Sequence, residues 1–283
     1  MNINEMKFVL SHKIPNIIKG KLNNNLIFAF WGRYLNFGDQ MTPVLLKYYG
    51  FTPIFSRATN SKFFPKAQIV SVGTILSYIP SDFNGIILGS GMDNEKKSFS
   101  HAKILALRGK LTQNNIGVTK VVLGDPGLLM KKVFPQEVRK EYDLGIIPHF
   151  IDKNHNFLLK WKKNFSDKNV LFIDVQRKVS EVVNDIKKCR YIVSSSLHGL
   201  ITADSFDIPN AMFTIRHYKR SLYDDFKFMD YYSAYDEELS VYEANGNESK
   251  EFFISLTKNR DGIKKAKLIH DLDSLFRNLR NYL

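Results

Sequence analysis

The residues with the clearest chemical potential stand together in SSSLHG, residues 194–199 of this 283-residue chain. An apolar run typical of a buried strand precedes them, and an apolar stretch typical of a helix follows. Hydroxyl and N–H groups at the start of a helix bind anions, and the helix dipole favours negative charge there. His198 can donate to a phosphate or move a proton near neutral pH. The pattern predicts a phosphate-binding, acid–base site at Ser194, Ser195, Ser196, His198 and Gly199. The alternative is that the serines only satisfy backbone groups at a strand–helix corner.

Two further residues with suitable chemistry follow predicted strands. His149, in GIIPHF, is a second acid–base candidate. Arg108, in LRGKLT, stands after an apolar strand and before a helix. Its guanidinium can hold a carboxylate or a phosphate through two parallel hydrogen bonds. We therefore predict that Arg108 clamps an anionic group.

Three loops in the first half of the chain also carry polar groups. NFGD could present Asn36 and Asp39 to a ligand, or Asp39 could simply cap the following helix. The spacing of its glycines is not the G-x-G-x-x-G of a dinucleotide site. GSGM contributes Ser90. In GDPGLL, Asp125 is best explained by a turn and a helix cap, with a catalytic role as the alternative.

These segments must be positioned by the surrounding strands and helices. Short apolar strands alternate with helical stretches, which predicts an α/β fold with parallel sheets. We expect strands at 26–31, 68–72, 85–88, 103–107, 120–123, 143–147, 170–175, 191–194 and 210–214. We expect helices at 39–49, 180–188, 200–205 and, from an apolar stripe, 263–279. In such folds ligands bind beyond the carboxyl ends of the strands.

A charged, proline-containing stretch, residues 131–142, interrupts the alternation. There we place the boundary between an N-terminal domain, residues 1–140, and a C-terminal domain, residues 141–283, with a cleft between them. One arrangement considered for the final helix, residues 263–279, is packing against the N-terminal domain.

Composition limits the partners. Lysine and arginine number 41 against 28 acidic residues, and the net charge of +13 permits an anionic partner such as nucleic acid, an anionic membrane surface or a phosphorylated substrate. The alternative is that the lysines only form a solvated surface. The basic residues are scattered and form no nucleic-acid motif, so we expect no nucleic acid. The single cysteine, Cys189, excludes an internal disulfide and indicates a reducing compartment. Because we find no membrane-spanning run and no signal peptide, we expect a cytoplasmic protein.

Taken in order, these segments resemble the polysaccharide pyruvyl transferase family, in particular its bacterial exopolysaccharide branch. The matching segments are NFGD (36–39), SVGTIL (71–76), GSGM (89–92), LRGKLT (107–112), GDPGLL (124–129), GIIPHF (145–150), SSSLHGLITAD (194–204) and FKFMDYY (226–232). The resemblance implies two Rossmann-like domains that face a cleft, as in GT-B glycosyltransferases.

The resemblance also implies a reaction. Such enzymes transfer pyruvate from phosphoenolpyruvate, as a ketal, onto a sugar of a bacterial surface polysaccharide or capsule precursor. The expected acceptor is an undecaprenyl-pyrophosphate-linked oligosaccharide, and peripheral contact with the inner face of the plasma membrane fits it. Phosphoenolpyruvate is then a co-substrate, and no cofactor and no metal are expected.

Residue roles follow from the same resemblance. The arginine of the family's R-G-x-L-T segment falls on Arg108 and its late histidine on His198, both associated with donor binding and catalysis. Many relatives carry arginine two positions before that histidine, where this chain has Ser196. Candidates for the replacement cation are, in order, Lys227, then Arg216 and Arg220.

On this assignment, His198 and His149 are the catalytic residues. The donor-binding residues are Arg108, Ser194, Ser195, Ser196, Gly199 and Lys227. The acceptor-binding residues are Asn36, Asp39 and Ser90.

Three other functions stay open at this level. A GT-B glycosyltransferase that uses a nucleotide sugar would share the architecture. A non-catalytic carbohydrate- or nucleic-acid-binding module would bind without turnover. A serine hydrolase is a weaker alternative, because SSSLHG is not the G-x-S-x-G nucleophile turn.

Overall fold

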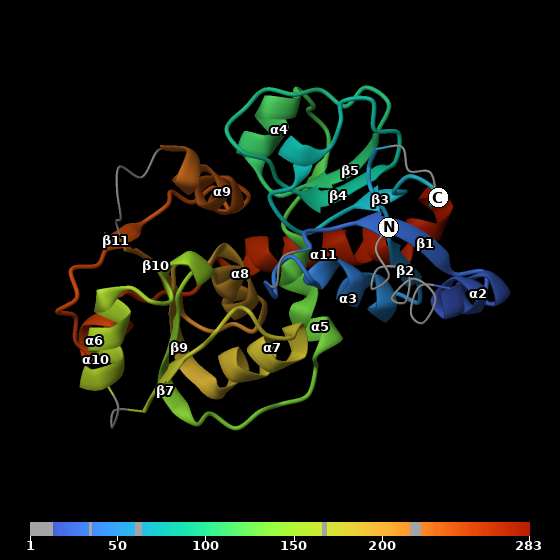
Figure 1. Ribbon diagram of the computed structural model, residues 1–283. Helices are drawn as coiled ribbons and strands as arrows, with labels where there is room; N and C mark the ends of the chain where they lie inside the picture. The colour runs from blue at the N-terminus through green and yellow to red at the C-terminus, as the bar shows by residue number, and fades with distance from the viewer. Residues whose placement is uncertain (1–13, 34–35, 60–63, 166–168, 216–221) are drawn as a thin grey trace.

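The fold is α/β and contains two parallel sheets (Figure 1). A computed structural model describes residues 14–33, 36–59, 64–165, 169–215 and 222–283. One sheet has six strands in the order β2-β1-β3-β4-β5-β6, and the other has five in the order β11-β10-β9-β7-β8. Every pairing between neighbouring strands is parallel. The prediction of an α/β fold with parallel sheets is therefore confirmed.

The six-stranded sheet is built from the first half of the chain. Its strands are β1 (Leu26–Phe30), β2 (Thr52–Phe55), β3 (Ile69–Val70), β4 (Ile86–Ser90), β5 (Lys103–Leu107) and β6 (Val122–Leu123). The helices around it are α2 (Ile14–Leu22), α3 (Met41–Tyr48), α4 (Lys110–Ile116) and α5 (Met130–Val133), with the 3₁₀ turns η2 (Leu76–Tyr78) and η3 (Pro126–Leu129). All five residues of β4 are buried, as expected for a central strand covered on both faces.

The five-stranded sheet is built from the second half. Its strands are β7 (Tyr142–Ile147), β8 (Val170–Phe172), β9 (Cys189–Ser194), β10 (Asn210–Thr214) and β11 (Val241–Glu243). Its helical elements are η4 (Phe150–Asp152), α6 (Asn156–Asn164), α7 (Val179–Lys188), α8 (Leu197–Ser205), α9 (Leu222–Ser233), α10 (Lys250–Leu256), α11 (Gly262–Arg277) and η5 (Leu279–Tyr282). The strand predictions at 103–107 and 210–214 match β5 and β10. A domain boundary near residue 140 stays a prediction.

Two local predictions need correction. Asp39 does not cap α3, because α3 begins at Met41, and Gln40, in the capping position, makes no side-chain capping bond. The carboxylate of Asp39 is therefore not engaged as a helix cap. The helix predicted at 200–205 begins three residues earlier, at Leu197, so His198 lies in the first turn of α8.

Late segments of the chain pack on the first sheet. Helix α11 runs along it in Figure 1, and the ring of Phe276 stacks on Tyr49 at a centroid distance of 5.0 Å. The Tyr49 hydroxyl donates to Asp273 at 2.6 Å. Helix α9 contacts α4, where the Lys110 N–H donates to the Ser233 hydroxyl at 2.8 Å. One buried apolar cluster includes residues of both sheets and of α11, so the two halves share a core.

A buried ion pair joins α9 to the end of β5. Arg108 Nε donates to Asp230 Oδ2 at 2.8 Å, and both side chains are 0% exposed. Asp230 also accepts from the Thr112 N–H at 2.8 Å and from the Thr112 hydroxyl at 2.7 Å. A Cβ at Gly109 would lie 1.7 Å from the Asp230 carbonyl oxygen, so only glycine lets α9 come this close.

Among the described residues, no helix is long and apolar enough to cross a membrane.

Replacing Asp230 by asparagine should destabilise the protein strongly. The change leaves the Arg108 guanidinium buried without its counter-charge, and breaking such a pair costs about 3–5 kcal/mol. Chemical denaturation followed by fluorescence measures this loss. Asp236→Asn is the control, because Asp236 pairs with Lys110 on the nearby surface, where both side chains are about half exposed. The control should unfold close to the wild-type midpoint. Equal losses in the two variants would contradict the importance of the buried pair.

Candidate functional site

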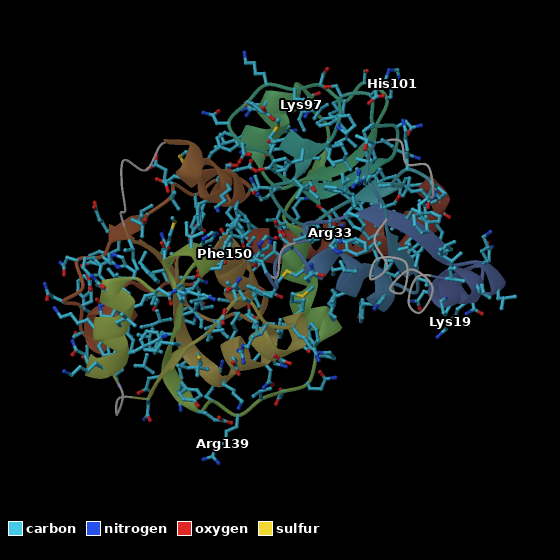
Figure 2. All side chains as sticks on the ribbon, in the orientation of Figure 1. Lys19, Arg33, Lys97, His101, Arg139 and Phe150 are labelled. Atoms are coloured by element: carbon cyan, nitrogen blue, oxygen red, sulfur yellow. The ribbon has the colours of Figure 1, made fainter. Side chains whose placement is uncertain are left out.

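Most of the predicted polar residues meet in one cavity of about 240 Å³. Its lining residues are Asn36, Asp39, Thr74, Tyr78, Asp93, His149, Ser196, Leu197, His198 and Lys227. All of these except Leu197 carry a polar side-chain group. Both halves of the chain contribute, and Figure 2 places Phe150, the neighbour of His149, where the second half faces the first. The structure thus brings six of the predicted site residues together: Asn36, Asp39, His149, Ser196, His198 and Lys227.

The serines before α8 have different positions. The Ser194 hydroxyl accepts from the Ser196 N–H at 2.9 Å and donates to the Ile147 carbonyl oxygen at 3.0 Å. The Ser195 hydroxyl accepts from the His149 N–H at 2.8 Å. These two buried serines therefore tie β9 to β7 and to the loop after it, as the structural alternative proposed. Of the three, only Ser196 lines the cavity. Gly199 lies inside α8, packed against Ser194, and does not line it either.

Residues from the first half of the chain pack closely against His198. A Cβ at Gly38 would lie 2.2 Å from its Nδ1, so the ring packs directly on that glycine. The ring of Phe37 meets it edge-on at 6.5 Å. His198 is 8% exposed. Burial lowers its pKa to about 3, and the positive charges of Arg108 and Lys227 add to this effect. At neutral pH the imidazole is therefore uncharged.

Asp125 faces this histidine from behind the cavity. Its Oδ1 accepts from the Gly127 N–H at 2.8 Å, which confirms that Asp125 caps η3. Its Oδ2 lies 3.9 Å from His198 Nε2, beyond hydrogen-bonding distance, and neither atom has a hydrogen-bond partner. Burial raises the pKa of Asp125 to about 6, while the Gly127 N–H and Arg108 oppose that rise. A small movement of either side chain, or a bridging water, would complete a hydrogen bond between Asp125 and His198.

Asp39 and Lys227 give the cavity its charges near His198. Burial raises the pKa of Asp39 to about 6, and the positive charge of Lys227 limits the rise. Asp39 therefore changes its charge close to physiological pH. Lys227 comes from α9, the helix that the Arg108–Asp230 pair fastens to the first half. Its place in the cavity depends on that attachment.

Two further predicted site residues, Arg108 and Ser90, lie away from the cavity wall. Arg108 is fully buried and stands behind Thr74, donating from Nη1 to the Thr74 hydroxyl at 2.6 Å. Its remaining contacts are to Asp230 and to the Met92 carbonyl oxygen. Ser90 is also buried, and its hydroxyl donates to the Ser71 carbonyl oxygen. Neither side chain reaches the lining in this conformation. Arg216 and Arg220 lie outside the described residues.

Four lining residues were not predicted from the sequence, namely Thr74, Tyr78, Asp93 and Leu197, and Asp125 was predicted first as a cap, with a catalytic role as the alternative. Signals existed for most of them. Thr74 belongs to SVGTIL, Asp93 directly follows GSGM, and Leu197 stands within SSSLHG. Tyr78 belongs to no recognised segment, and nothing in its neighbourhood indicated a site.

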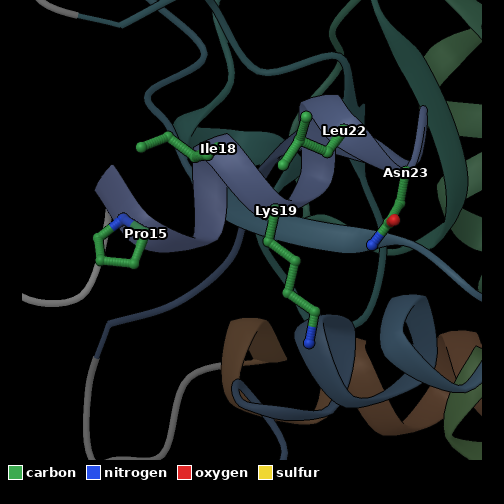
Figure 3. A pocket seen from close by; sticks show the side chains of 5 residues that line it. All are labelled: Pro15, Ile18, Lys19, Leu22 and Asn23. Carbon is green, nitrogen blue, oxygen red and sulfur yellow. The ribbon is translucent and has the colours of Figure 1, made fainter.

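A second hollow, of about 440 Å³, lies on α2. Pro15, Ile18, Lys19, Leu22 and Asn23 line it, and Figure 3 shows Lys19 pointing away from Ile18 and Leu22. Its only titratable lining group is Lys19. Because no set of polar groups converges there, the smaller cavity is the candidate active site.

Known proteins resemble a large part of this chain. The family model for polysaccharide pyruvyl transferase matches residues 16–218. An uncharacterised protein of Acanthamoeba polyphaga mimivirus is 36% identical over 185 residues, 60% of this chain and 61% of that protein. The succinoglycan biosynthesis protein ExoV of Rhizobium meliloti (strain 1021) is 26% identical over 191 residues, 64% of this chain and 57% of that protein.

The chain therefore spans about three fifths of the length of each of these relatives. No solved structure matches it. The family model covers well over half of the chain and includes every lining residue of the cavity except Lys227. The chain belongs to the polysaccharide pyruvyl transferase family.

Proposed function

We propose that this protein transfers pyruvate from phosphoenolpyruvate, as a ketal, to a sugar of a lipid-linked surface polysaccharide precursor. Family membership supports pyruvyl transfer to polysaccharide, and the name of the Rhizobium relative supports an exopolysaccharide product. One observation carries the placement of the reaction. A single polar cavity combines the cation Lys227 with three groups able to hold or move protons: Asp39, His149 and His198.

The reaction needs those components. A proton is added to the methylene carbon of phosphoenolpyruvate, and a sugar hydroxyl attacks the neighbouring carbon and loses its own proton. The bond from that carbon to the phosphate oxygen then breaks, and a second hydroxyl closes the ketal, again losing a proton. One phosphate leaves for each ketal formed. An acid–base pair and an anion-binding cation are sufficient for these steps.

The positions of the side chains suggest roles. Asp39, with a pKa of about 6, is well suited to give and take a proton near neutral pH. His198, uncharged and packed on Gly38, donates an N–H hydrogen bond to the phosphate or its bridging oxygen. His149 is the second proton-transfer candidate, and Lys227 attracts the carboxylate or phosphate of the donor. Asp39 thus has a different role from the acceptor-binding one expected from the sequence.

Turnover tests the proposed function directly. Phosphate release from phosphoenolpyruvate should require a sugar acceptor, and the product should gain the mass of pyruvate less one water. His198→Asn should lower kcat by a factor on the order of 100 to 1,000, because the imidazole that donates a hydrogen bond to the phosphate is lost. His101→Asn is the control, since His101 is exposed and remote from the cavity (Figure 2). If nucleotide sugars stabilise the protein against heat and phosphoenolpyruvate does not, a glycosyltransferase takes the place of this proposal.

A charge-relocation experiment tests the role of Lys227. Lys227→Ala should weaken phosphoenolpyruvate binding by about 10- to 100-fold, as expected for a lost hydrogen bond to a charged group. Adding Ser196→Arg should restore much of this affinity, because Ser196 lines the same cavity. Isothermal titration calorimetry measures both changes. Lys110→Ala removes the same charge outside the cavity and should have little effect. An unrestored double variant would show that the two positions are not interchangeable.

Donor binding should be accompanied by proton uptake. Burial and the neighbouring cations lower the pKa of His198 to about 3, and an anion beside the ring opposes those causes and raises it. The same anion raises the pKa of Asp39 further above 6. Near pH 6.5 the wild type should therefore take up more protons than Asp39→Asn when phosphoenolpyruvate binds.

Titrations in buffers of different ionisation enthalpy measure that difference. Comparing the two proteins cancels the proton exchange of phosphoenolpyruvate itself. Equal uptake by both would remove Asp39 from the proton balance, and smaller uptake by the wild type would contradict the expected sign.

A further inference from the structure

Tyr78 and Asp93 occupy one edge of the cavity and have no part in the roles assigned above. Tyr78 lines the cavity, yet it is 73% exposed, so most of its side chain is open to solvent. Asp93 follows β4 and is half-buried in the cavity wall. Exposed aromatic rings are ordinary when scattered. This one lies at the entrance of a polar site, beside a carboxylate.

We propose that Tyr78 and Asp93 form the subsite for the sugar ring of the acceptor. The proposal rests on the proposed function for its reaction, but the binding it describes is independent of the donor. The ring of Tyr78 packs against the apolar C–H face of the sugar, and the Asp93 carboxylate accepts hydrogen bonds from sugar hydroxyls. A neutral sugar has an apolar C–H face and a set of hydroxyl groups, and the aromatic ring and the carboxylate match these two features.

The two residues are held in fixed relation to each other. The Asp93 N–H donates to the Ser77 hydroxyl at 3.0 Å, which joins the loop after β4 to the turn that carries Tyr78. The Lys97 ammonium donates to the Ser77 carbonyl oxygen at 2.8 Å and to that of Leu76 at 3.4 Å. The backbone of Leu76 is also bonded, donating to Gly91 at 3.1 Å. Binding a sugar here therefore requires little ordering of the backbone that carries the two side chains.

Charge distinguishes Asp93 from Lys227, which lies on α9 and attracts an anionic donor. Asp93 repels a phosphate or carboxylate but accepts from neutral hydroxyls. Because Tyr78 is open to solvent, the bound sugar can continue into a longer chain. The chemistry at this edge therefore selects an uncharged residue of an oligosaccharide.

Direct binding tests the subsite without phosphoenolpyruvate. Saturation-transfer NMR with a panel of neutral di- to tetrasaccharides, ending in glucose, galactose or mannose, identifies a ligand for the full chain. Tyr78→Ala should weaken its binding about tenfold, the effect of an aromatic contact residue, and Tyr78→Phe should retain it. Asp93→Asn should weaken it as well. Tyr48→Ala is the control, because Tyr48 is an exposed tyrosine outside the cavity and should change nothing.

Titration of phosphoenolpyruvate into the same variants completes the test. Its affinity should stay within about twofold of wild type, since neither residue carries the donor-binding charge. Unchanged oligosaccharide binding in Tyr78→Ala, an equal loss of phosphoenolpyruvate affinity, or no oligosaccharide signal on the wild type would overturn the subsite. Oligosaccharide binding that needs Tyr78, combined with no turnover of phosphoenolpyruvate, would support the subsite while rejecting the proposed function.

Discussion

The cavity depends on one buried ion pair, between Arg108 at the end of β5 and Asp230 on α9. Taking both charges out of water is costly, so such a pair is weak evidence for added stability. Its effect here is on position. The pair and the two hydrogen bonds from Thr112 fix α9 against the first half, and α9 carries Lys227 to the cavity. Through its Nη1 group, Arg108 also fixes the Thr74 hydroxyl in the cavity wall. One guanidinium therefore sets the place of two lining residues from opposite halves.

The electrostatics of the cavity follow from the same arrangement. Arg108 behind the wall and Lys227 in it both disfavour a charged His198, which burial already keeps neutral. The same burial keeps the pKa of Asp39 near 6. The cavity therefore contains a titratable acid, an uncharged imidazole and a lysine. An anion that enters changes all of these balances in one direction, towards proton uptake.

Sequence patterns predicted the strands well and the side-chain partnerships poorly. Strand β5 follows from its unbroken apolar run, and β10 from an apolar run that ends at a turn. The position of α9 had no such signal, because its contact with α4 joins residues more than a hundred positions apart. SSSLHG contributes Ser196, Leu197 and His198 to the cavity, yet its other two serines bond to backbone groups of β7 and the following loop. Propensity and spacing do not distinguish a hydroxyl that faces a cavity from one that faces a neighbouring strand.

The buried ion pair explains why two of the recognised segments contain glycine at the positions where they do. In GSGM, a Cβ at Gly91 would lie 2.1 Å from Arg108 Cζ, so this position must be glycine for the guanidinium to lie flat behind the cavity. In LRGKLT, Gly109 admits the Asp230 backbone in the same way. Two segments that look like ligand-binding loops are thus explained first by packing around a buried charge. NFGD differs, because its Gly38 admits the imidazole of His198 itself. A recognised segment can contain both kinds of residue, because FKFMDYY supplies Asp230 to the ion pair and Lys227 to the cavity, and only the residues that line the cavity can contact a substrate directly.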